Sequence, residues 1–445
     1  MGFADQILTP LASLPTLSPE PANMTAQAHA PVKIGSVALE SPFALAPMAG
    51  MTDTAFRRLV KRRGGCGLVV TEMVSSEGLV RRIDRTLEYA EYTDEERPVS
   101  IQIFGGDPAK MAEAAQIVEG MGADVVDVNM GCPVPKIAKH QAGCSLMRMP
   151  EQAASVVRAM TRAVSIPVTV KMRSGWDETH VNALDVAGLM QDAGAAAVAV
   201  HGRTAAQSYS GRSDWDLIDE VARSLSIPVL GSGDCVAPED LVGRLRETAI
   251  AGVLVGRGAL RNPWIFEQAR ALGQGSAARP VTEQERGQFL LAYIDMLLSE
   301  GTDEAEGFRH TATVDRKAGP ARRGVRSRER WVLNKLRALG SWYTKGFDNG
   351  SRLRVAMNHT KSLDELRNII RDFFFVTAES IEMTPTSALD HSAGSRDAGA
   401  ADQLSPDFGL LTSSSTRPCP DSSRARLSSR RRGTSPSGSR NMPGA

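Results

Sequence analysis

Short runs of apolar residues alternate with amphipathic stretches along the middle of the chain. Eight runs lie at residues 43–47, 67–73, 99–103, 124–129, 167–172, 197–202, 228–233 and 251–258. Segments between them, such as MAEAAQIVEGMGA and PEQAASVVRAMTRAV, carry apolar residues three and four positions apart, which is the helical period. Apolar strands that alternate with helices are typical of a parallel sheet covered by those helices. Eight such units over residues 43–270 predict a (β/α)8 TIM barrel, and a doubly wound open sheet is the alternative.

Three further amphipathic segments follow the predicted barrel. They are TEQERGQFLLAYIDMLLSEG, RERWVLNKLRALGSWYTKG and SLDELRNIIRDFFF, the last of which opens with Ser362 and Glu365 at capping-box spacing. We therefore predict a barrel domain at residues 32–275 and a small helical domain at residues 281–382. The two ends, 1–31 and 383–445, are rich in Pro, Ser or Arg without periodicity. Such segments bury little apolar surface, so we predict a flexible N-terminal extension and a disordered C-terminal tail.

The overall composition excludes several classes of protein. Lys and Arg number 52 against 51 Asp and Glu, so net charge alone indicates no polyanionic partner, and only local clusters could do so. The 5 cysteines never fall in a C-x-x-C spacing, which argues against a disulfide framework or a zinc site. No apolar run is long enough to span a bilayer. We expect a cytoplasmic, monomeric protein without a metal and without membrane association.

Polar or glycine residues end nearly every predicted strand, where a barrel carries its chemistry. In chain order they are Pro47-Met48-Ala49-Gly50, Glu72, Gln102, Asn129 with Cys132, Lys171 with Arg173, His201-Gly202-Arg203, Gly231-Ser232-Gly233-Asp234 and Gly256-Arg257. Cys132 lies on a turn between a glycine and a proline, whereas a structural cysteine usually lies among apolar neighbours. This placement predicts a thiol that takes part in chemistry.

The last two strand ends suggest a phosphate site. GSGD and VGRG are short glycine turns before helices, where backbone N–H groups and Arg257 would bind a phosphate. Ordinary tight turns are the alternative. Lys171, Gln102 and His201 each have a structural explanation, but beside a phosphate site they suit a flavin. No G-x-G-x-x-G segment is present, which argues against a Rossmann nicotinamide domain.

Seven segments of the chain resemble the tRNA-dihydrouridine synthases. They are APMAGMTDTAFRRL (46–59), TEMVSSEGL (71–79), VNMGCPVPK (128–136), AGCSLM (142–147), VKMRSGWD (170–177), HGRTAAQSYSG (201–211) and VGRGALRNPW (255–264). The resemblance covers the predicted barrel and, more loosely, the helical domain to about Phe375. It implies FMN as cofactor, NADPH or NADH as electron donor, and tRNA as the substrate whose uridine C5=C6 bond is reduced.

The resemblance also implies roles for individual residues. Cofactor contacts fall to Pro47, Met48, Ala49, Gln102, Lys171 and His201, and phosphate contacts to Ser232, Gly233, Asp234, Gly256 and Arg257. Cys132 matches the proton donor to C5 of the uracil. Asn129 would hold the uracil edge with two hydrogen bonds, and Arg173 would neutralise charge on its carbonyl. The family usually has Asn where Ser232 stands, so one side-chain amide contact is lost here.

Basic residues after the barrel are the candidates for contacts with RNA phosphates. They are Arg322, Arg323, Arg326, Arg328, Arg330, Lys335 and Lys345, and a solvated charged segment is the alternative. Two other functions stay open. One is a barrel flavoenzyme that reduces a free pyrimidine or another small enone. The other is an RNA-binding homologue without catalysis, against which the intact Cys132, Lys171 and His201 speak.

Overall fold

Eight parallel strands close into a barrel in the computed structural model, which describes residues 31–138, 141–300, 304–312 and 325–375. The strands are β3 (Phe43–Leu45), β4 (Leu68–Val70), β7 (Val99–Phe104), β8 (Val125–Met130), β9 (Val168–Arg173), β10 (Ala197–His201), β11 (Val229–Ser232) and β12 (Gly252–Val255). Neighbours along the chain pair with one another, and both β12 with β3 and β4 with β7 pair in parallel, which closes the circle. The predicted TIM barrel is confirmed, and the open sheet is excluded.

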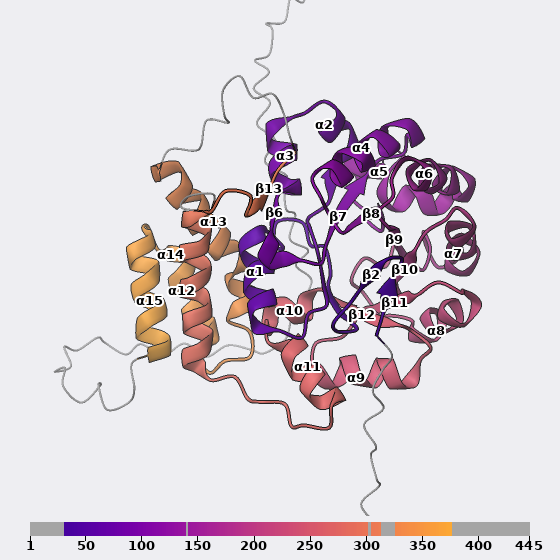
Figure 1. Cartoon of the computed structure of the whole chain (residues 1–445). Helices are drawn as coiled ribbons and strands as arrows, with labels where there is room; N and C mark the ends of the chain where they lie inside the picture. The colour runs from indigo at the N-terminus through magenta and orange to yellow at the C-terminus, as the bar shows by residue number, and fades with distance from the viewer. Residues whose placement is uncertain (1–30, 139–140, 301–303, 313–324, 376–445) are drawn as a thin grey trace, which may run out of the picture. The chain divides into compact units, whose positions relative to one another are not determined.

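Helices surround the barrel strands (Figure 1). The outer layer contains α1 (Thr54–Arg63), α4 (Pro108–Gly120), α6 (Pro150–Ala163), α7 (Ala183–Asp192), α8 (Trp215–Ser224), α9 (Pro238–Glu247) and α11 (Ile265–Gly273). Aspartate side chains at residues 53, 107 and 214 cap α1, α4 and α8 by accepting backbone N–H groups of the first turn. Outward-facing strand residues such as Val126, Val128 and Val170 are fully buried in the core between strands and helices.

Short elements line the rim of the barrel between strands and outer helices. They are β5 (Val74–Ser75), α2 (Ser76–Val80), α3 (Asp84–Ala90), β6 (Tyr92–Thr93), the 3-10 turn at Asp94–Glu96, α5 (Pro135–Ala138), the 3-10 turn at Gly143–Arg148 and α10 (Arg257–Arg261). Most of them follow the C-terminal end of a strand, so they build the mouth of the barrel.

The barrel interior is apolar at one end and polar at the other. A hairpin of β1 (Lys33–Ile34) and β2 (Val37–Ala38) precedes the first barrel strand, and Ile34 packs with Leu68, Leu230 and Leu254 inside the barrel. Toward the C-terminal ends of the strands, alternate positions carry polar side chains instead. Since successive strand residues face opposite sides, this two-residue period directs the polar side chains into the barrel.

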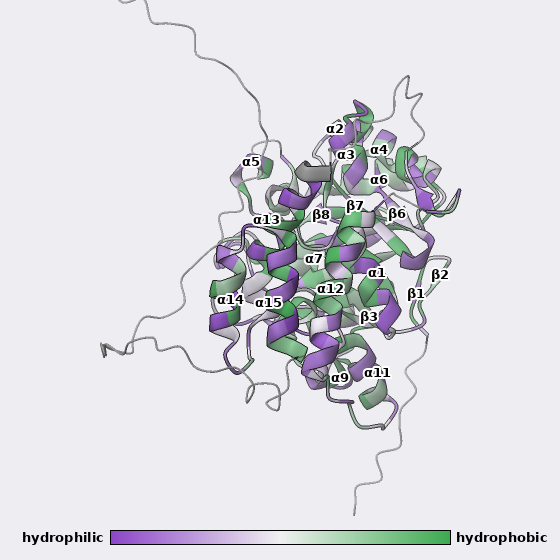
Figure 2. Ribbon diagram, turned by 90° about the vertical axis from the view of Figure 1, so that its left-hand side faces the viewer, coloured by the Kyte–Doolittle hydropathy of each residue, from purple (hydrophilic) through white to green (hydrophobic). Residues whose placement is uncertain are grey.

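Among the described residues, four helices follow the barrel: α12 (Glu283–Ser299), α13 (Val325–Tyr343), α14 (Gly350–His359) and α15 (Leu363–Phe375). The three predicted helices are present, and α14 is an additional one. Purple and green residues alternate along α12 and α15 in Figure 2, as expected of amphipathic helices. From α12, Phe289 and Tyr293 reach the ring of Phe56 on α1, with centroids 6.2 and 6.1 Å away.

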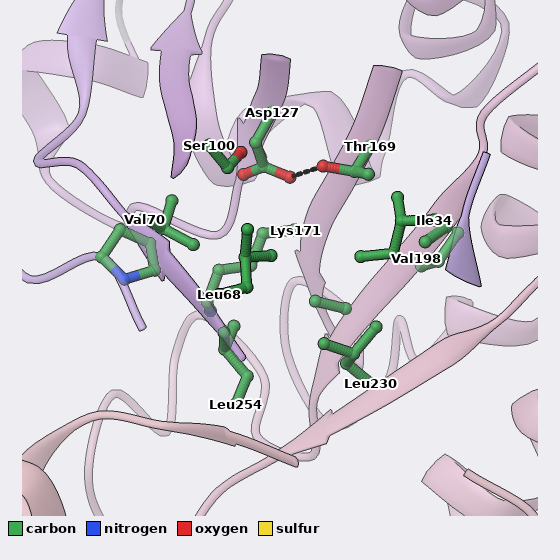
Figure 3. Close-up of a pocket in the computed structure, with 13 residues that line it drawn as sticks. Ile34, Leu68, Val70, Ser100, Asp127, Thr169, Lys171, Val198, Leu230 and Leu254 are labelled. Carbon is green, nitrogen blue, oxygen red and sulfur yellow. Dashed lines mark hydrogen bonds between the residues drawn. The ribbon is translucent and has the colours of Figure 1, made fainter. Parts of the chain in front are cut away.

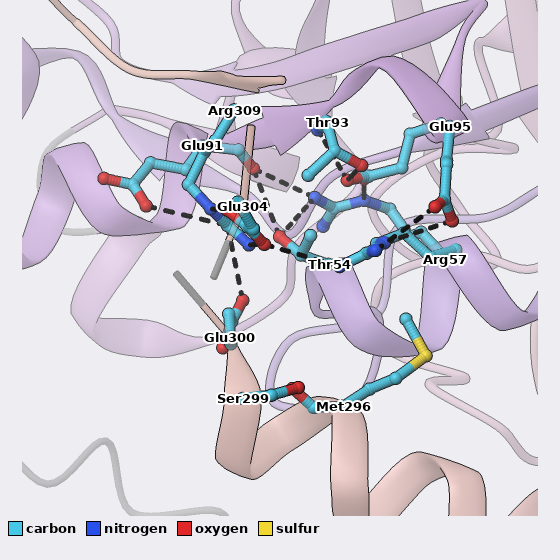
Figure 4. Close-up of polar contacts among 12 residues, drawn as sticks. Thr54, Arg57, Glu91, Thr93, Glu95, Met296, Ser299, Glu300, Glu304 and Arg309 are labelled. Carbon is cyan, nitrogen blue, oxygen red and sulfur yellow. Dashed lines mark hydrogen bonds and ion pairs between the residues drawn. The ribbon is translucent and has the colours of Figure 1, made fainter. Parts of the chain in front are cut away.

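The helices are joined to the barrel by polar contacts as well (Figure 4). Strand β13 (Arg309–His310) pairs in antiparallel fashion with β6. Arg309 forms ion pairs with Glu91, Glu300 and Glu304 at 3.8, 3.6 and 2.6 Å. The barrel and these helices therefore belong to one compact unit. The predicted boundaries at residues 275, 281 and 382 stay predictions.

The predicted tails at 1–31 and 383–445 lie outside the described residues, except for Pro31. Within the described part of the chain, no helix is both long and apolar enough to span a membrane.

Candidate active site

Polar residues that were predicted at the strand ends meet at the C-terminal mouth of the barrel. Asn129 lies beside Lys171 in the pairing of β8 with β9. His201 lies beside Arg173 on one side and Ser232 on the other. Neighbouring strands thus place these five side chains in adjacent positions of one rim.

A chain of hydrogen bonds runs across the mouth from Asp127 to the backbone of Cys132. Thr169 Oγ1 and Gln102 Nε2 donate to the two carboxylate oxygens of Asp127 over 2.6 and 2.7 Å. Asn129 Nδ2 donates to Gln102 Oε1 over 2.7 Å, and Asn129 Oδ1 accepts the N–H of Cys132 at 2.9 Å. A carboxylate only accepts and a backbone N–H only donates, so each amide has one satisfactory orientation. The chain therefore fixes the turn that carries Cys132.

Cys132 is the most accessible cysteine in the described part of the chain. It is half-buried, whereas Cys66, Cys144 and Cys235 are buried. Arg173 Nε donates to the carbonyl of Gly131 over 2.8 Å, which supports the turn from a second side. Burial raises the pKa of the Cys132 thiol, and the nearby Arg173 only partly opposes this. The thiol is therefore protonated at neutral pH and able to donate its proton.

Lys171 faces a small cavity inside the barrel, about 30 Å³ in volume. Figure 3 shows Ser100, Asp127 and Thr169 on the same cavity wall. Burial, and then the positive charge of Arg173, lower the pKa of Lys171 to about 8, while Asp127 opposes the shift. Lys171 is thus a cation at neutral pH, although burial makes its charged form less favourable. An anion bound beside it would stabilise that charge.

His201 has a defined tautomer. Its Nδ1 lies 3.0 Å from the carbonyl oxygen of Ser232, which can only accept, so Nδ1 carries the proton. Burial, and then the charges of Lys171 and Arg173, lower the pKa of His201 to about 3. The ring is therefore neutral, and Nε2, which has no hydrogen-bond partner among the described residues, can accept a hydrogen bond.

The turns after β11 and β12 pack closely against their surroundings. Gly233 has φ +133°, and a Cβ there would lie 2.1 Å from Ser213 Oγ. At Gly256 a Cβ would lie 3.4 Å from Met48 Sδ, so this turn approaches the loop after β3. Only glycine allows the backbone at position 233 to come so close to its surroundings, whereas the distance at Gly256 is an ordinary contact.

Two arginines accompany these turns. Arg203 is buried and donates from Nη2 to Asp234 Oδ2 over 2.8 Å, while its Nη1 is buried without a hydrogen-bond partner among the described residues. The guanidinium of Arg257 lies 4.6 Å from the centroid of the Tyr209 ring, which is 61% exposed. An unpartnered buried donor beside a second cation is an arrangement that suits an anion.

Comparison with known proteins identifies the family of the chain. A family model described as dihydrouridine synthase (Dus) matches residues 44–376. A tRNA-dihydrouridine synthase B from Xanthomonas axonopodis pv. citri is 35% identical over 345 residues, which cover 77% of this chain and 96% of that protein. The chain belongs to the dihydrouridine synthase family.

Other similar proteins agree with this assignment. A probable tRNA-dihydrouridine synthase from Rickettsia conorii is 41% identical over 57% of this chain and 77% of its own length. A tRNA-dihydrouridine synthase B from Pseudomonas aeruginosa is 42% identical over 53% of this chain and 71% of its own. Among solved structures, morphinone reductase aligns with a TM-score of 0.42 at 14% identity, over 56% of this chain and 90% of that one. That structural likeness is too distant to carry an argument.

In this dihydrouridine synthase family member, the predicted site residues differ in how many of their hydrogen-bonding groups are already used within the protein. Asn129 Oδ1 accepts the backbone N–H groups of Gly131 and Cys132, and one N–H of its Nδ2 donates to Gln102. Its contact with a uracil edge stays a prediction. Arg173 Nη1 donates to the carbonyls of Thr204 and Ser208 at 2.8 and 3.1 Å. Both residues therefore support the loops of the mouth, whatever further contact they make.

The residues predicted for the cofactor lie around the mouth. Pro47 and Met48 are half-buried and Ala49 is exposed, in the loop after β3. Gln102 is buried. One of its two side-chain N–H groups donates to Asp127, and the other is not used in the hydrogen bonds that lead to Cys132. Asp234 directs its carboxylate to Arg203 and to the N–H of Ser213, 2.7 Å away, so its side chain serves the turn itself. The backbone of that turn remains the candidate for phosphate contacts.

Sequence reasoning missed Asp127, Thr169 and Arg203. The first two were assigned to apolar strands, yet a strict two-residue alternation through Asp127 and Asn129, and through Thr169 and Lys171, predicts polar side chains inside the barrel. Arg203 was noted at a strand end but given no role. Its position two residues after His201 is the signal that places it on the same side of the strand.

The basic residues after the barrel require one correction. Lys335 was predicted to contact RNA, but its side chain is 9% exposed and forms an ion pair with Asp53. Arg328 is half-buried and bonded to the Leu297 carbonyl and Glu300, each over 2.8 Å. Arg330 and Lys345 are exposed. Arg322 and Arg323 and the side chain of Arg326 lie outside the described residues.

Proposed function

We propose that this protein is a tRNA-dihydrouridine synthase that reduces the C5=C6 bond of uridines in tRNA, with FMN as cofactor and NADPH or NADH as electron donor. The observation that carries the proposal is a protonated, half-buried Cys132 held on a rigid turn beside the Lys171 cation. Membership in the dihydrouridine synthase family supports the same reaction.

The residues of the mouth fit FMN. Gly233, Gly256 and Arg257 would hold its phosphate, and the unpartnered Nη1 of Arg203 offers a further donor. Lys171 would lie beside the ring, His201 Nε2 would accept an N–H, and the remaining N–H of Gln102 would donate. Pro47, Met48 and Ala49 would support the ring from the loop after β3. Bound in reduced form, FMN would supply the hydride for C6 of the uracil.

Cys132 supplies the proton that the reaction also needs. Hydride addition at C6 leaves negative charge at C5 and on the C4 carbonyl, and C5 must be protonated. Burial keeps the thiol protonated, and the hydrogen bonds from Cys132 N–H and to Gly131 O fix where Sγ lies. A positioned acid of this kind contributes about 10²–10⁴-fold to a rate.

The uridine has to leave its stack to reach the mouth, because the thiol lies within the barrel rim. Tyr209, exposed on the rim beside Arg257, presents a ring face on which a base can stack. Arg330 and Lys345 are exposed and would contact phosphates.

The test is a reconstituted reaction on tRNA transcribed without modifications. The purified protein is incubated with FMN, NADPH and the transcript, and the nucleosides are analysed by mass spectrometry. We expect yellow protein and conversion of specific uridines to dihydrouridine. Protein that binds no FMN, or that oxidises NADPH only with a small enone and leaves the transcript unchanged, contradicts the proposal.

A further inference from the structure

The loop from Pro47 to Asp53 carries three of the proposed cofactor contacts and folds tightly on itself. The backbone N–H groups of Met51 and Thr52 donate to the Met48 carbonyl at 3.0 and 3.1 Å. Thr52 Oγ1 in turn accepts the N–H of Met48 at 3.0 Å. Gly50, at φ +77°, makes this reversal possible. The shape of the loop is therefore set around Gly50.

Both polar groups of Gly50 are held from outside the loop. Its N–H donates to Glu72 Oε2 over 2.6 Å, from the segment that follows β4. Its carbonyl accepts from Lys335 Nζ over 3.1 Å, from helix α13. The turn beside Met48 and Ala49 is thus fixed on one side by the barrel and on the other by a helix that follows the barrel.

Lys335 also meets the end of the loop. It forms an ion pair with Asp53, whose carboxylate caps α1 through the N–H of Phe56 at 2.8 Å and accepts the Tyr293 hydroxyl at 2.7 Å. The side chains of Lys335 and Asp53 are 9% and 13% exposed. Although burial acts against it, Asp53 and Glu72 hold the pKa of Lys335 above its usual value, so the lysine remains a cation.

A buried ion pair by itself indicates little more than packing, because desolvation offsets much of its attraction. Here the Lys335 cation also has a backbone partner, and that contact indicates a role beyond packing. Lys335 donates to the backbone carbonyl of Gly50, next to Ala49, and Gly50 has no side chain that would otherwise fix its conformation. Removing the lysine would release the loop at this point while leaving the barrel strands in place.

We propose that Lys335 is a positioning residue for the cofactor loop, and that retention of FMN depends on helix α13. The inference rests on the proposed function, since it takes Pro47, Met48 and Ala49 as contacts of FMN. Lys335 does not touch the cofactor in this assignment; it acts through the Gly50 carbonyl and Asp53.

The experiment compares full-length Lys335→Met and Lys335→Gln with the wild type. FMN affinity is measured by quenching of flavin fluorescence, and hydrogen exchange is followed for the amides of residues 48–52. Loss of a hydrogen bond from a charged donor is expected to weaken FMN binding by about tenfold or more in the Met variant. The Gln variant keeps an N–H for Gly50, so we expect a smaller loss. The exposed Lys361→Met is the matched control and should leave both readouts unchanged.

The Met variant leaves Asp53 without its cation and is at risk of misfolding. If it does misfold, Asp53→Asn combined with Lys335→Met removes the uncompensated charge while still lacking the Gly50 contact, and weaker FMN binding is expected there too. A folded variant that binds FMN within about twofold of wild type, with unchanged exchange at residues 48–52, overturns the positioning role alone. A wild-type protein that binds no FMN overturns the proposed function instead.

Discussion

The two supports of the mouth are built on different physics. Below the Cys132 turn, the chain from Asp127 through Gln102 and Asn129 consists of directed hydrogen bonds between strands that are neighbours in the sheet. Beside the loop after β3, the support is a cation on α13 that pairs with Asp53 and donates to the Gly50 carbonyl. The first fixes orientation through donor and acceptor roles, whereas the second depends on helices that follow the barrel in the sequence.

This difference separates residues that act in chemistry from residues that hold the protein together. The hydrogen bonds at the strand ends terminate on the backbone N–H of Cys132, whose thiol is half-buried. The ionic contacts terminate on backbone carbonyls and helix caps. Next to them, Arg57 donates to Glu96 and to the Thr52 carbonyl, and Figure 4 shows Arg57 beside Thr54, to which it also donates. Deleting the helices after the barrel would therefore remove contacts that support the barrel, as well as a surface for RNA. The variants below test each side of the comparison.

The largest effect is expected for Cys132→Ala. NADPH should still reduce the bound flavin at a rate near that of wild type, because the thiol supplies only a proton to the substrate. Transfer to uridine should slow by about 10²–10⁴-fold, since C5 lacks a positioned acid. Stopped-flow reoxidation of the reduced enzyme by unmodified tRNA measures this step, and Cys132→Ser is the matched variant with a weaker acid. Reoxidation of the alanine variant at the wild-type rate would falsify the role of Cys132.

On the ionic side, Arg57→Met should lower the free energy of unfolding by about 3–5 kcal/mol, because it leaves a buried carboxylate without its cation. Glu96 is fully buried, and burial raises its pKa. Protonation relieves the unpaired charge, so the variant should regain stability relative to wild type as the pH falls through the raised pKa of Glu96. Denaturant unfolding at several pH values measures both effects.

Arg81→Met is the control for this change, because Arg81 pairs with Glu77 and both side chains are largely exposed. Its loss should cost at most about 1 kcal/mol. Arg57→Met combined with Glu96→Gln should recover part of the lost stability. If Arg57→Met is as stable as wild type, the ion pair of Arg57 with Glu96 is not essential to the stability of the protein.

Variants of Asp127 test whether the hydrogen bonds from Asp127 through Gln102 and Asn129 position the Cys132 turn. Asp127→Asn can still accept from Gln102 while turning its amide group toward the Thr169 hydroxyl, so uridine reduction should fall by only about threefold. Asp127→Leu leaves Gln102 Nε2 without a buried acceptor, and reduction should fall by about tenfold or more. The alkylation rate of Cys132 by iodoacetamide reports the same disturbance without the cofactor. Equal rates in the Leu and Asn variants would show that the chain does not position the turn.

Much of this site was visible in the sequence, and the reason is local. The apolar runs predict the strands, and parallel strands place residues such as Lys171 and His201 at one rim without knowledge of any tertiary contact. Lys335 could not be judged in this way. An exposed and a buried lysine look alike on an amphipathic helix, and the burial of Lys335 depends on Asp53 and Gly50, which lie far away in the chain.

The pH dependence of uridine reduction should come from Lys171 and not from His201. His201 has a pKa of about 3 and stays neutral, and burial keeps the Cys132 thiol protonated, so the rate should be level between pH 5.5 and 7.5. Lys171 has a pKa of about 8 in the protein without FMN, and an anionic flavin beside it would raise that pKa; above the raised value Lys171 loses its charge, and the rate should fall as the pH rises. Asp127 raises the pKa of Lys171, so Asp127→Asn should move this fall to lower pH. An inflexion near the ordinary pKa of histidine would contradict this assignment.

The smallest effect concerns the exposed cations after the barrel. Arg330→Gln and Lys345→Gln should each reduce the slope of log affinity for tRNA against log salt by about 0.7–0.9, the value expected for one phosphate contact. Lys335→Gln is the matched comparison, and it should leave the slope unchanged because that lysine is buried against Asp53. Filter binding over a series of salt concentrations measures the three slopes. If Lys335→Gln reduces the slope as much as Lys345→Gln does, Lys335 contacts RNA. The distinction between Lys335 as a support of the loop after β3 and the exposed cations as an RNA surface would then be wrong.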